Sequence, residues 1–389
     1  MIIQPIREEH VEAVQLLWDF CFNRGERGPR LAFDQLSHDR VQTFVLEGDG
    51  RLDSTYLSIH FDMVYDAHRL PMSGIAGVAV APAARGRGHA HRMMHHAVSH
   101  ARERGMLVSM LWAFSLDFYR ELGWELVGRI LRFELPIREI RLDAEARRVR
   151  QVEPKATDTI MWLQRTYASR YRGACERAPR RWEHLLRERN RPINMFVYDG
   201  ESGPEGYMYY CLPPVGEGKM TLTEMVALTS EAHRGLLGSI RRLDMQIERV
   251  EWHGPADDWV LVEPYDSCLE VSILRQPMLR VVNAGALLGL QCREGVSADY
   301  TLRVEEPEWA EGPRGYRVHI RDGVSEVVPC APEDCAVGMT QRTFAQCFMG
   351  DPDAMLLRRA GHIEVRDEAA FEAFCKHFPA AITYATESF

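Results

Sequence analysis

The stretch that decides the fold is Val78-Ala79-Val80-Ala81-Pro82-Ala83-Ala84-Arg85-Gly86-Arg87-Gly88-His89-Ala90. A short apolar strand turns here through arginine and glycine into a helix, whose apolar residues recur at helical spacing: Met93, Met94, Ala97, Val98 and Ala101. Unpaired backbone N–H groups and the helix dipole favour an anion at a helix N-terminus. The glycines let the backbone approach a ligand closely, and the arginines add positive charge. The stretch therefore predicts a cradle for a pyrophosphate.

The type of cradle follows from the motif that the turn matches. The turn contains neither the G-x-G-x-x-G fingerprint of dinucleotide-binding folds nor the G-K-[ST] of a Walker phosphate loop. It does match Arg-x-x-Gly-x-Ala, with Arg85, Gly88 and Ala90 in place after a V-x-V strand. In this it resembles the acetyl-CoA motif of the Gcn5-related N-acetyltransferases (GNAT). The alternative interpretation is a tight strand-to-helix turn that binds no ligand.

Composition narrows the class of protein. A chain of 389 residues is too long for one ordinary domain, and 46% hydrophobic with 26% charged residues is typical of a soluble globular protein. A net charge of −9 argues against a nucleic-acid partner and mildly attracts a cationic small molecule. The sequence contains no apolar signal-peptide core and no run long enough to span a bilayer. We expect a cytoplasmic protein with no membrane partner.

Cysteines and histidines do not form a metal-binding pattern. The nine cysteines contain no C-x-x-C pair, which favours buried free thiols over a disulfide framework or a zinc ribbon. His91 and His95, and then His96 and His100, stand four residues apart on the helix after the cradle. They lack an H-E-x-x-H signature and fall largely outside the apolar stripe. We expect a solvated polar face and no bound metal.

The first block of the chain, residues 1–150, reads as a mixed α/β domain that binds acetyl-CoA. Val11, Val14, Leu17 and Cys21 mark an early helix. Strand patterns follow at 42–47, 55–64 and 75–80, then the cradle helix, then an apolar strand over 107–114. This order, with a ligand at the carboxyl end of the V-x-V strand, fits an acetyltransferase domain.

The second block, residues 151–274, is a fainter copy of the first. Residues 224–228 resemble the V-x-V strand, and residues 229–235 resemble the turn. The helix expected after this turn is marked by apolar residues at helical spacing: Leu236, Ile240, Leu243 and Ile247. A leucine stands where the first turn has a small or polar residue, so this copy is predicted to keep the fold and lose the cofactor. The basic segment 177–191 is expected to form a solvated helix.

The third block, residues 275–389, has strand patterns at 301–304, 316–320 and 326–328, broken by Gly and Pro turns. A last helix puts Phe371, Phe374, Cys375 and Phe378 on one face, with Asp367 as N-cap. The block resembles a sterol-carrier-like α+β domain, which the opening Met278-Leu279-Arg280-Val281-Val282-Asn283 typifies in one family. The predicted fold class is thus α/β (α+β): two tandem acetyltransferase-like domains and a sterol-carrier-like domain.

An acid for the reaction is present after the apolar strand at 107–114. An N-acetyltransferase takes a proton from an amine and returns one to a thiolate, and amines titrate near ~10.4, thiols near ~8.5 and tyrosine near ~10. Tyr119, in Phe-Tyr-x-x-Leu-Gly-Trp, is where this fold places the residue that faces the thioester sulfur. The alternative is a structural tyrosine with its hydroxyl in water.

The combination of features resembles the Eis (enhanced intracellular survival) family over the whole chain. These features are two acetyltransferase-like halves, a sterol-carrier-like domain, the tyrosine motif and the terminal Phe389. Family members acetylate amines of aminoglycosides, and in some cases lysines, from acetyl-CoA, and assemble as hexamers. The resemblance implies that Tyr119 is the general acid and that the α-carboxylate of Phe389 is the general base. It also implies a set of cofactor-binding residues: Val78, Ala79, Val80, Arg85, Gly86, Arg87, Gly88, His89, Ala90, His91, Phe114 and Ser115.

The acceptor stays open, because Trp112-Ala113-Phe114-Ser115 stands where the aminoglycoside-acetylating members read Ala-Ser-Glu. We expect an amine of a cationic small molecule, aminoglycoside or polyamine-like, or a lysine. One alternative is a lipid- or ligand-binding protein that uses its third domain on an inert acetyltransferase scaffold. The intact first motif argues against that, since a scaffold has no need of it. A transcriptional regulator is disfavoured by the negative charge and the missing helix-turn-helix pattern.

Overall fold

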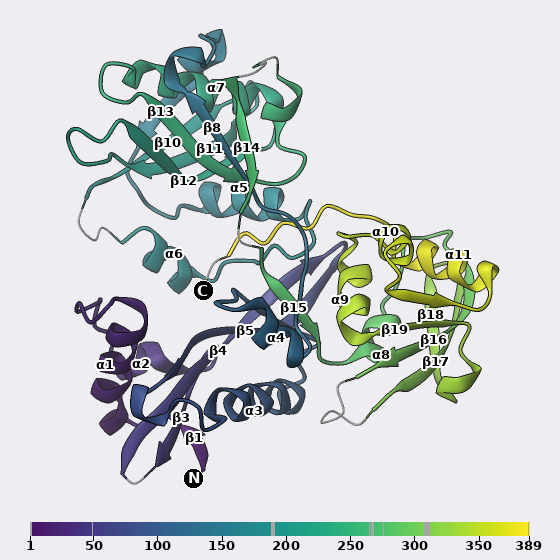
Figure 1. The fold of residues 1–389 in the computed structure, drawn as a ribbon. Coiled ribbons are helices and arrows are strands. Elements are labelled where there is room, and N and C mark those ends of the chain that lie inside the picture. Colours follow the sequence, from purple (N-terminus) through teal and green to yellow (C-terminus); the bar gives the residue numbers. More distant parts are fainter. Residues whose placement is uncertain are drawn as a thin grey trace.

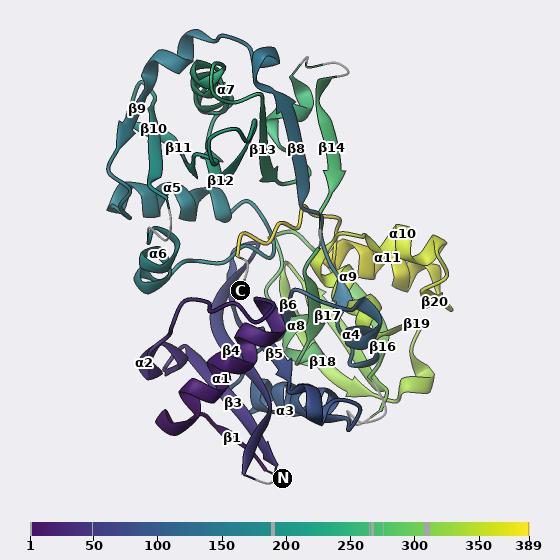
Figure 2. The same ribbon diagram turned by 60° about the vertical axis from the view of Figure 1, so that its left-hand side comes forward.

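Three β-sheets with their helices form the molecule (Figure 1). The computed structural model describes residues 2–48, 50–187, 191–263, 265, 268–274, 276–306, 312–387 and 389. In Figures 1 and 2 the second sheet lies above the first and the third lies beside the first. The yellow C-terminal tail runs from the third sheet back between the first and the second. No helix in these described ranges is both long and apolar enough to cross a membrane.

The first sheet has the order β1-β3-β4-β5-β6-β15-β7, with β2 paired to β3. Its strands are β1 Ile3–Pro5, β2 Ser37–His38, β3 Val41–Gly48, β4 Arg51–Tyr65, β5 His68–Val80, β6 Val108–Leu111, β7 Glu125–Leu126 and β15 Met278–Val281. Its helices are α1 Val11–Phe22, α2 Phe33–Leu36, α3 His89–Glu103 and α4 Leu116–Glu121. The early helix, the three strands before the cradle and the cradle helix are confirmed. The apolar strand predicted over 107–114 ends at Leu111.

The second sheet has the order β14-β8-β13-β12-β11-β10-β9. Its strands are β8 Leu131–Pro136, β9 Val149–Val152, β10 Ile193–Asp199, β11 Pro204–Cys211, β12 Lys219–Ala227, β13 Arg249–Gly254 and β14 Glu270–Ile273. Its helices are α5 Asp158–Ala168, α6 Pro179–Leu185 and α7 Ser230–Ile240. This is a second mixed α/β sheet, as predicted.

Two strands join a different sheet from the one that the predicted domain boundaries at 150 and 274 assign them to. β8, from the block assigned to the first domain, pairs with β13 and β14 of the second sheet. β15 lies in the segment 278–283, which was expected to open the third domain, yet it pairs with β6 and β7 of the first sheet. Apolar alternation shows that these segments are strands but carries no information about which sheet edge they join.

The third sheet is mixed and has the order β18-β17-β16-β19-β20. Its strands are β16 Ala298–Glu305, β17 Arg314–Arg321, β18 Val324–Cys330, β19 Val337–Thr340 and β20 Ile363–Val365, and its helices are α8 Ala284–Leu288, α9 Gln341–Met349, α10 Ala354–Arg359 and α11 Glu368–His377. Asp367 caps α11 by accepting from the backbone N–H of Ala369 at 3.0 Å, as predicted. Phe371, Phe374 and Phe378 are buried. The sterol-carrier resemblance of this domain stays a prediction.

The predicted turn at 229–235 in the second block is wrong. β12 ends at Ala227 and α7 begins at Ser230, capped by the side chain of Thr229, so residues 230–235 are already helical. A Cβ on Gly235 would lie 2.7 Å from the ring of Tyr198, so this glycine allows close helix packing and not phosphate approach. The helix ends at Ile240, before two of the leucine and isoleucine positions expected in it.

The basic segment 177–191 is not a solvated helix throughout. α6 covers only Pro179–Leu185, and residues 188–190 lie outside the described part of the chain. The side chain of Arg177 is 3% exposed and is paired with Glu224 and Glu387. Positive charge at this position therefore binds another part of the chain instead of facing solvent.

Candidate functional site

The candidate site begins where β5 and β6 separate. β5 pairs in parallel with β6 only from Met72 to Ile75, whereas its pairing with β4 continues to Val80. The last five residues of β5 thus have a neighbouring strand on one side only. An open strand edge offers backbone N–H and C=O groups to an extended ligand, as in strand addition to a sheet. The predicted V-x-V segment, residues 78–80, lies on this edge.

A β-bulge shapes the same edge. Thr55 pairs with Ala79 and Leu57 pairs with Ala76, so two residues of β5, Gly77 and Val78, face one residue of β4. Gly77 has φ +58°, and its carbonyl accepts from the indole N–H of Trp18 at 2.9 Å. The bulge and its anchor on α1 turn the end of β5 away from β6.

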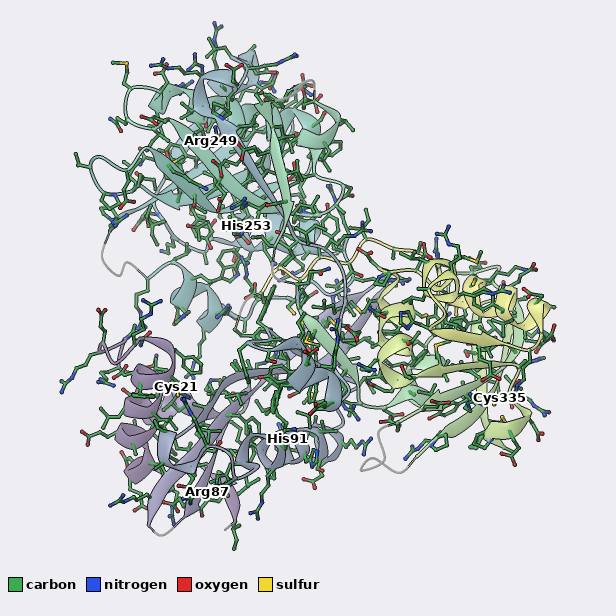
Figure 3. The ribbon with its side chains drawn as sticks, viewed as in Figure 1. Cys21, Arg87, His91, Arg249, His253 and Cys335 are labelled. Carbon is green, nitrogen blue, oxygen red and sulfur yellow. The ribbon has the colours of Figure 1, made fainter. Side chains whose placement is uncertain are left out.

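The predicted cradle follows β5 directly. Gly86 and Gly88 both have φ +75°, and a Cβ on either would meet no atom within 4 Å, so open space surrounds both. The first helical bond of α3 runs from Arg92 N–H to Gly88 O, which leaves the three preceding N–H groups directed out of the helix N-terminus. Arg85 and Arg87 are exposed beside it. Figure 3 labels Arg87 and His91 on this part of the first domain.

The histidines of α3 differ in their surroundings. His89 is buried with its Nε2 3.6 Å from Asp53, so its part in the cradle is limited to its backbone N–H. His91 is exposed, 3.4 Å from Glu121. The polar-face prediction is wrong for His96 and His100, whose rings each pack 4.7 Å from that of Phe44; burial lowers the pKa of both. In the described ranges no three His, Cys, Asp or Glu side chains gather as a metal-ligand set.

The opposite wall of the opening is formed by α4 and the residues before it. Ser115 caps α4, accepting from the N–H of Phe118 at 3.5 Å. Phe114 is 67% exposed, and its ring lies 5.4 Å from that of Tyr119. Tyr119 is 2% exposed and also contacts the ring of Trp124. Aromatic packing therefore fixes the position of the predicted acid.

The chain terminus, 270 residues further along, ends at the same opening. The ring of Phe389 packs 5.0 Å from that of Phe61. The indole N–H of Trp112 donates to the carbonyl of Glu387 at 3.2 Å. The carboxylate of Glu387 pairs with Arg177 and Arg181 of the second domain, at 2.5 and 2.7 Å. Figures 1 and 2 place the C-terminus between the first and second sheets.

One cavity of about 540 Å³ brings these parts together. Four predicted site residues line it: Val78, Phe114, Tyr119 and Phe389. Of the remaining predicted residues, Ser115 caps α4 beside the cavity, and the others continue along the end of β5 and the turn into the N-terminus of α3. The open edge of β5, the N-terminus of α3 and the cavity lined by Tyr119 and Phe389 thus follow one another along the first domain.

A carboxylate of α1 also lines this cavity. Asp19, on α1, lines the cavity and accepts from the N–H of Gly28 at 2.8 Å, which lowers the pKa of the carboxyl. Arg30 pairs with its other oxygen at 2.8 Å. Trp18 and Phe22 from the same helix add aromatic walls. The sequence prediction missed this wall, since the apolar pattern of α1 shows only the face that packs on the sheet.

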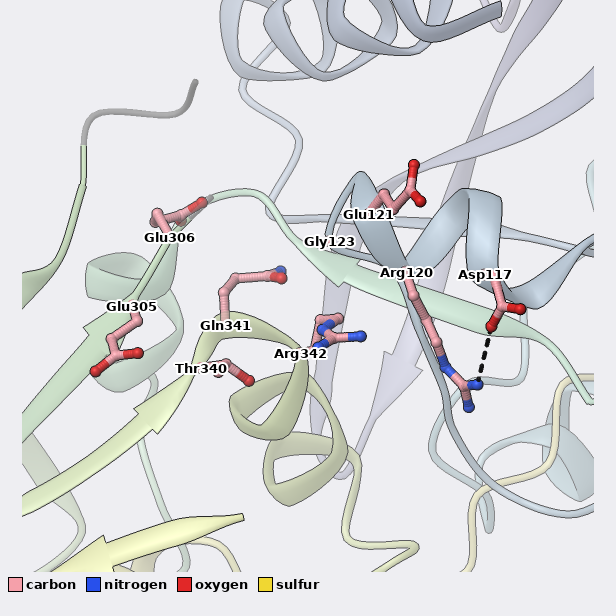
Figure 4. Close-up of a pocket in the computed structure, with 9 residues that line it drawn as sticks. All are labelled: Asp117, Arg120, Glu121, Gly123, Glu305, Glu306, Thr340, Gln341 and Arg342. Atoms are coloured by element: carbon pink, nitrogen blue, oxygen red, sulfur yellow. Dashed lines mark ion pairs between the residues drawn. The ribbon is translucent and has the colours of Figure 1, made fainter. Parts of the chain in front are cut away.

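A second cavity, of about 500 Å³, lies between α4 and the start of α9 (Figure 4). It contains none of the predicted site residues. Arg120 is paired with Asp117 at 3.8 Å and with Glu125 at 2.9 Å, and Arg342 is paired with Glu125 at 3.7 Å. Its charges are thus compensated within the protein, and we assign it no ligand.

Comparison with known proteins agrees with the geometry. Two family models, each described as an acetyltransferase (GNAT) domain, match residues 2–127 and 173–281 and together span more than half of the chain. No protein with a curated description matches the sequence.

Solved structures match over the full length. A GCN5-related N-acetyltransferase from Anabaena variabilis has a TM-score of 0.88 at 19% identity, covering 100% of both chains. One from Kribbella flavida has a TM-score of 0.79 at 24% identity, covering 100% of this chain and 98% of that one. Eis1 from Mycobacterium abscessus has a TM-score of 0.80 at 18% identity, covering 100% of both. The chain is therefore an acetyltransferase of the GNAT family, with two GNAT domains in the full-length fold that it shares with Eis1.

Proposed function

We propose that this acetyltransferase transfers the acetyl group of acetyl-CoA to an amine of a cationic small molecule, aminoglycoside or polyamine-like, or to a lysine. The observation that carries the proposal is the cavity that Tyr119 and Phe389 line together, at the open edge of β5. A proton donor and a carboxylate beside one cavity can perform the proton transfers of amine acetylation.

The cofactor is proposed to follow the edge of β5. The backbone of Val78, Ala79 and Val80 would bind the pantetheine and the acetyl carbonyl, because this part of β5 has a strand neighbour on one side only. Phe114 and Ser115 would line the cofactor. The pyrophosphate would lie against the N-terminus of α3, held by the arginines and backbone N–H groups of 85–91.

Proton movement is assigned to two residues. The α-carboxylate of Phe389, with an ordinary pKa of about 3.5, orients the ammonium of the acceptor and passes one of its protons to water. The neutral nitrogen then attacks the thioester carbon, the C–N bond forms, and the C–S bond breaks. The Tyr119 hydroxyl donates its proton to the departing thiolate. The nitrogen then loses a second proton, which returns through water to the Tyr119 phenolate, so the products are a neutral thiol and a neutral acetamide.

A cationic acceptor is supported by the charge of the cavity. Asp19 is an anion that lines the cavity and pairs with Arg30, and Phe389, whose α-carboxylate is a second anion, lines the same cavity. The aromatic walls of Trp18, Phe22 and Phe114 suit a cation as well. A panel of aminoglycosides, polyamines and lysine peptides distinguishes the acceptor classes, with coenzyme A release as the readout.

The experiment that tests the roles extends the chain. A short C-terminal Gly-Ser extension displaces the α-carboxylate and leaves every side chain intact. We expect it to reduce kcat strongly with unchanged acetyl-CoA affinity, whereas the same extension at the N-terminus should change neither kcat nor that affinity. Tyr119→Phe is expected to lower kcat by about 10²–10⁴-fold, again without loss of acetyl-CoA binding. Full activity of the C-terminal extension would leave the base unassigned.

Three further expectations belong with this proposal. The Eis-like resemblance implies a hexamer, which light scattering of the purified protein measures. The sequence patterns described above lead us to expect, in addition, a cytoplasmic location and a site that works without a metal. Activity retained after exhaustive chelation tests the last of these.

A further inference from the structure

The second domain keeps the strand opening although it has lost the cradle. β12 pairs in parallel with β13 only over Lys219–Thr221, whereas its pairing with β11 continues to Ala227. This is the asymmetry that β5 shows between β6 and β4. Because α7 begins at Ser230, no loop follows β12 that could hold a pyrophosphate. The opening is therefore available for something smaller than acetyl-CoA.

A cavity of about 240 Å³ occupies this opening. Met225 and Ala227 of β12 form one wall, and α5 with the residues after it contributes Tyr167 and Tyr171. α5 occupies the position at this cavity that α1 occupies at the first cavity, where α1 contributes Trp18, Asp19 and Phe22 to the wall. The site occupies the second domain's equivalent of the acceptor pocket.

A buried histidine whose ring has no hydrogen-bond partner among the described residues lines this cavity. His233 is 2% exposed, and neither of its ring nitrogens has a hydrogen-bond partner in the part of the chain that the structure describes. Its Nε2 lies 3.2 Å from the carboxylate of Asp258, which itself accepts from the N–H of Val260 at 3.0 Å. A neutral imidazole with its proton on Nε2, toward Asp258, keeps Nδ1 as an acceptor. A buried acceptor left without a donor is unfavourable, and a ligand that donates to it would remove that penalty.

The other groups around the cavity favour a positively charged donor. Asp257 supplies a second carboxylate, and Trp259 joins the two tyrosines as a third aromatic wall. The rings of Tyr167 and Tyr171 lie 5.2 Å apart, edge to face. Arg170 also lines the cavity, but its guanidinium donates to the carbonyl of Leu228 at 2.7 Å. Carboxylates and aromatic faces together are the usual surroundings of an ammonium group.

We propose that this cavity of the second domain is a binding site for a small primary alkylammonium ion. Its N–H groups donate to Nδ1 of His233 and to the carboxylate of Asp257, and its alkyl chain packs on the tyrosine rings and Met225. The cavity volume limits the ligand to a short chain. This proposal does not depend on the chemistry assigned to the first domain.

Titration calorimetry with n-butylammonium chloride tests the site, with n-butanol as the neutral control. We expect one butylammonium bound per second-domain cavity and no heat from butanol. Asp257→Asn should weaken this binding by about tenfold or more, because a hydrogen bond to a charged group is lost. Asp199→Asn is the matched control, since Asp199 pairs with Arg150 on the surface of the same sheet and should bind as the parent does.

A second pair of variants separates this site from the first cavity, which an amine also suits. His233→Phe removes the acceptor and should abolish the heat, while acetyl-CoA binding, measured in the same protein, reports an intact fold. Asp19→Asn neutralises the carboxylate of the first cavity and should not change the heat of butylammonium binding. The proposal is overturned if butylammonium gives no heat, if butanol binds equally well, or if Asp19→Asn and not Asp257→Asn removes the binding.

Discussion

Gly74 is the residue on which the position of the chain end depends. It lies in β5, where a Cβ would stand 2.7 Å from the ring of Phe61 and 2.9 Å from that of Phe389. Both distances are too short for real contacts, so the two rings reach the strand only because residue 74 has no side chain. A glycine inside a strand often marks a close approach of this kind.

Gly74→Ala is accordingly expected to displace the Phe389 ring and with it the proposed base. We predict a fall in kcat on the order of tenfold or more, as for other misplacements of about an ångström in a catalytic site. Acetyl-CoA affinity should change little. Gly238→Ala serves as control, since its new Cβ would meet its nearest atoms at an ordinary 3.5 Å. Equal steady-state rates for the two variants would mean that the terminus does not need this contact.

Residues whose role is local could be predicted from the sequence, and residues paired over long distances could not. Gly86, Gly88 and the α3 N-terminus are recognisable because a turn and a helix start are properties of adjacent residues. Arg177 and Glu387 are 210 residues apart, and nothing near either one indicates the other. A buried ion pair between distant segments has no sequence period, so the arginine was interpreted as part of a solvated helix.

At the scale of elements, the two strand-to-helix units explain why one domain keeps a cradle. β5 and α3 are separated by residues 81–88, whereas β12 and α7 are separated by two residues, Leu228 and Thr229. The predicted loss of the cofactor in the second domain was argued from a leucine that would obstruct a turn. The structure supplies a simpler reason, because the turn itself is missing. Propensity and spacing locate the elements but leave such boundaries uncertain by a turn of helix.

Gly88→Leu tests the cradle at the scale of the helix. It imposes a left-handed strain of about 1–2 kcal/mol and places a branched side chain where the pyrophosphate is proposed. Gly105→Leu, just beyond the other end of α3, imposes the same strain, since Gly105 has φ +69° and open space around it. We predict that calorimetry finds acetyl-CoA binding at one site per chain, strongly weakened in Gly88→Leu and close to normal in Gly105→Leu. Similar losses in both would attribute the effect to strain alone.

On the scale of the whole molecule, the second domain holds the chain end at the first domain's site. Arg177 pairs with Glu224 of β12 at 2.6 Å and with Glu387 of the tail, and Arg181 pairs with the other oxygen of Glu387 at 2.7 Å. Tyr207 donates to Glu224 at 2.7 Å. Two short connections, from β7 to β8 and from β14 to β15, also join the first and second sheets.

Glu387→Gln should release the tail, because it removes the buried charge with which both Arg177 and Arg181 pair. Breaking such a buried pair costs about 3–5 kcal/mol, enough to open a short terminal segment locally. We predict that carboxypeptidase removes Phe389 at least on the order of tenfold faster than in the parent, which measures release without reference to catalysis. The kcat for acetyl transfer should fall in parallel, with acetyl-CoA affinity unchanged. Glu364→Gln is the control: Glu364 forms exposed ion pairs with Arg303 and Arg366, so this variant should change neither the cleavage rate nor kcat. Faster cleavage with an unchanged kcat would show that the ion-pair network anchors the tail but that the tail does not supply the base. Unchanged cleavage would show that Trp112 and the Phe61 ring hold the terminus in place without the ion-pair network.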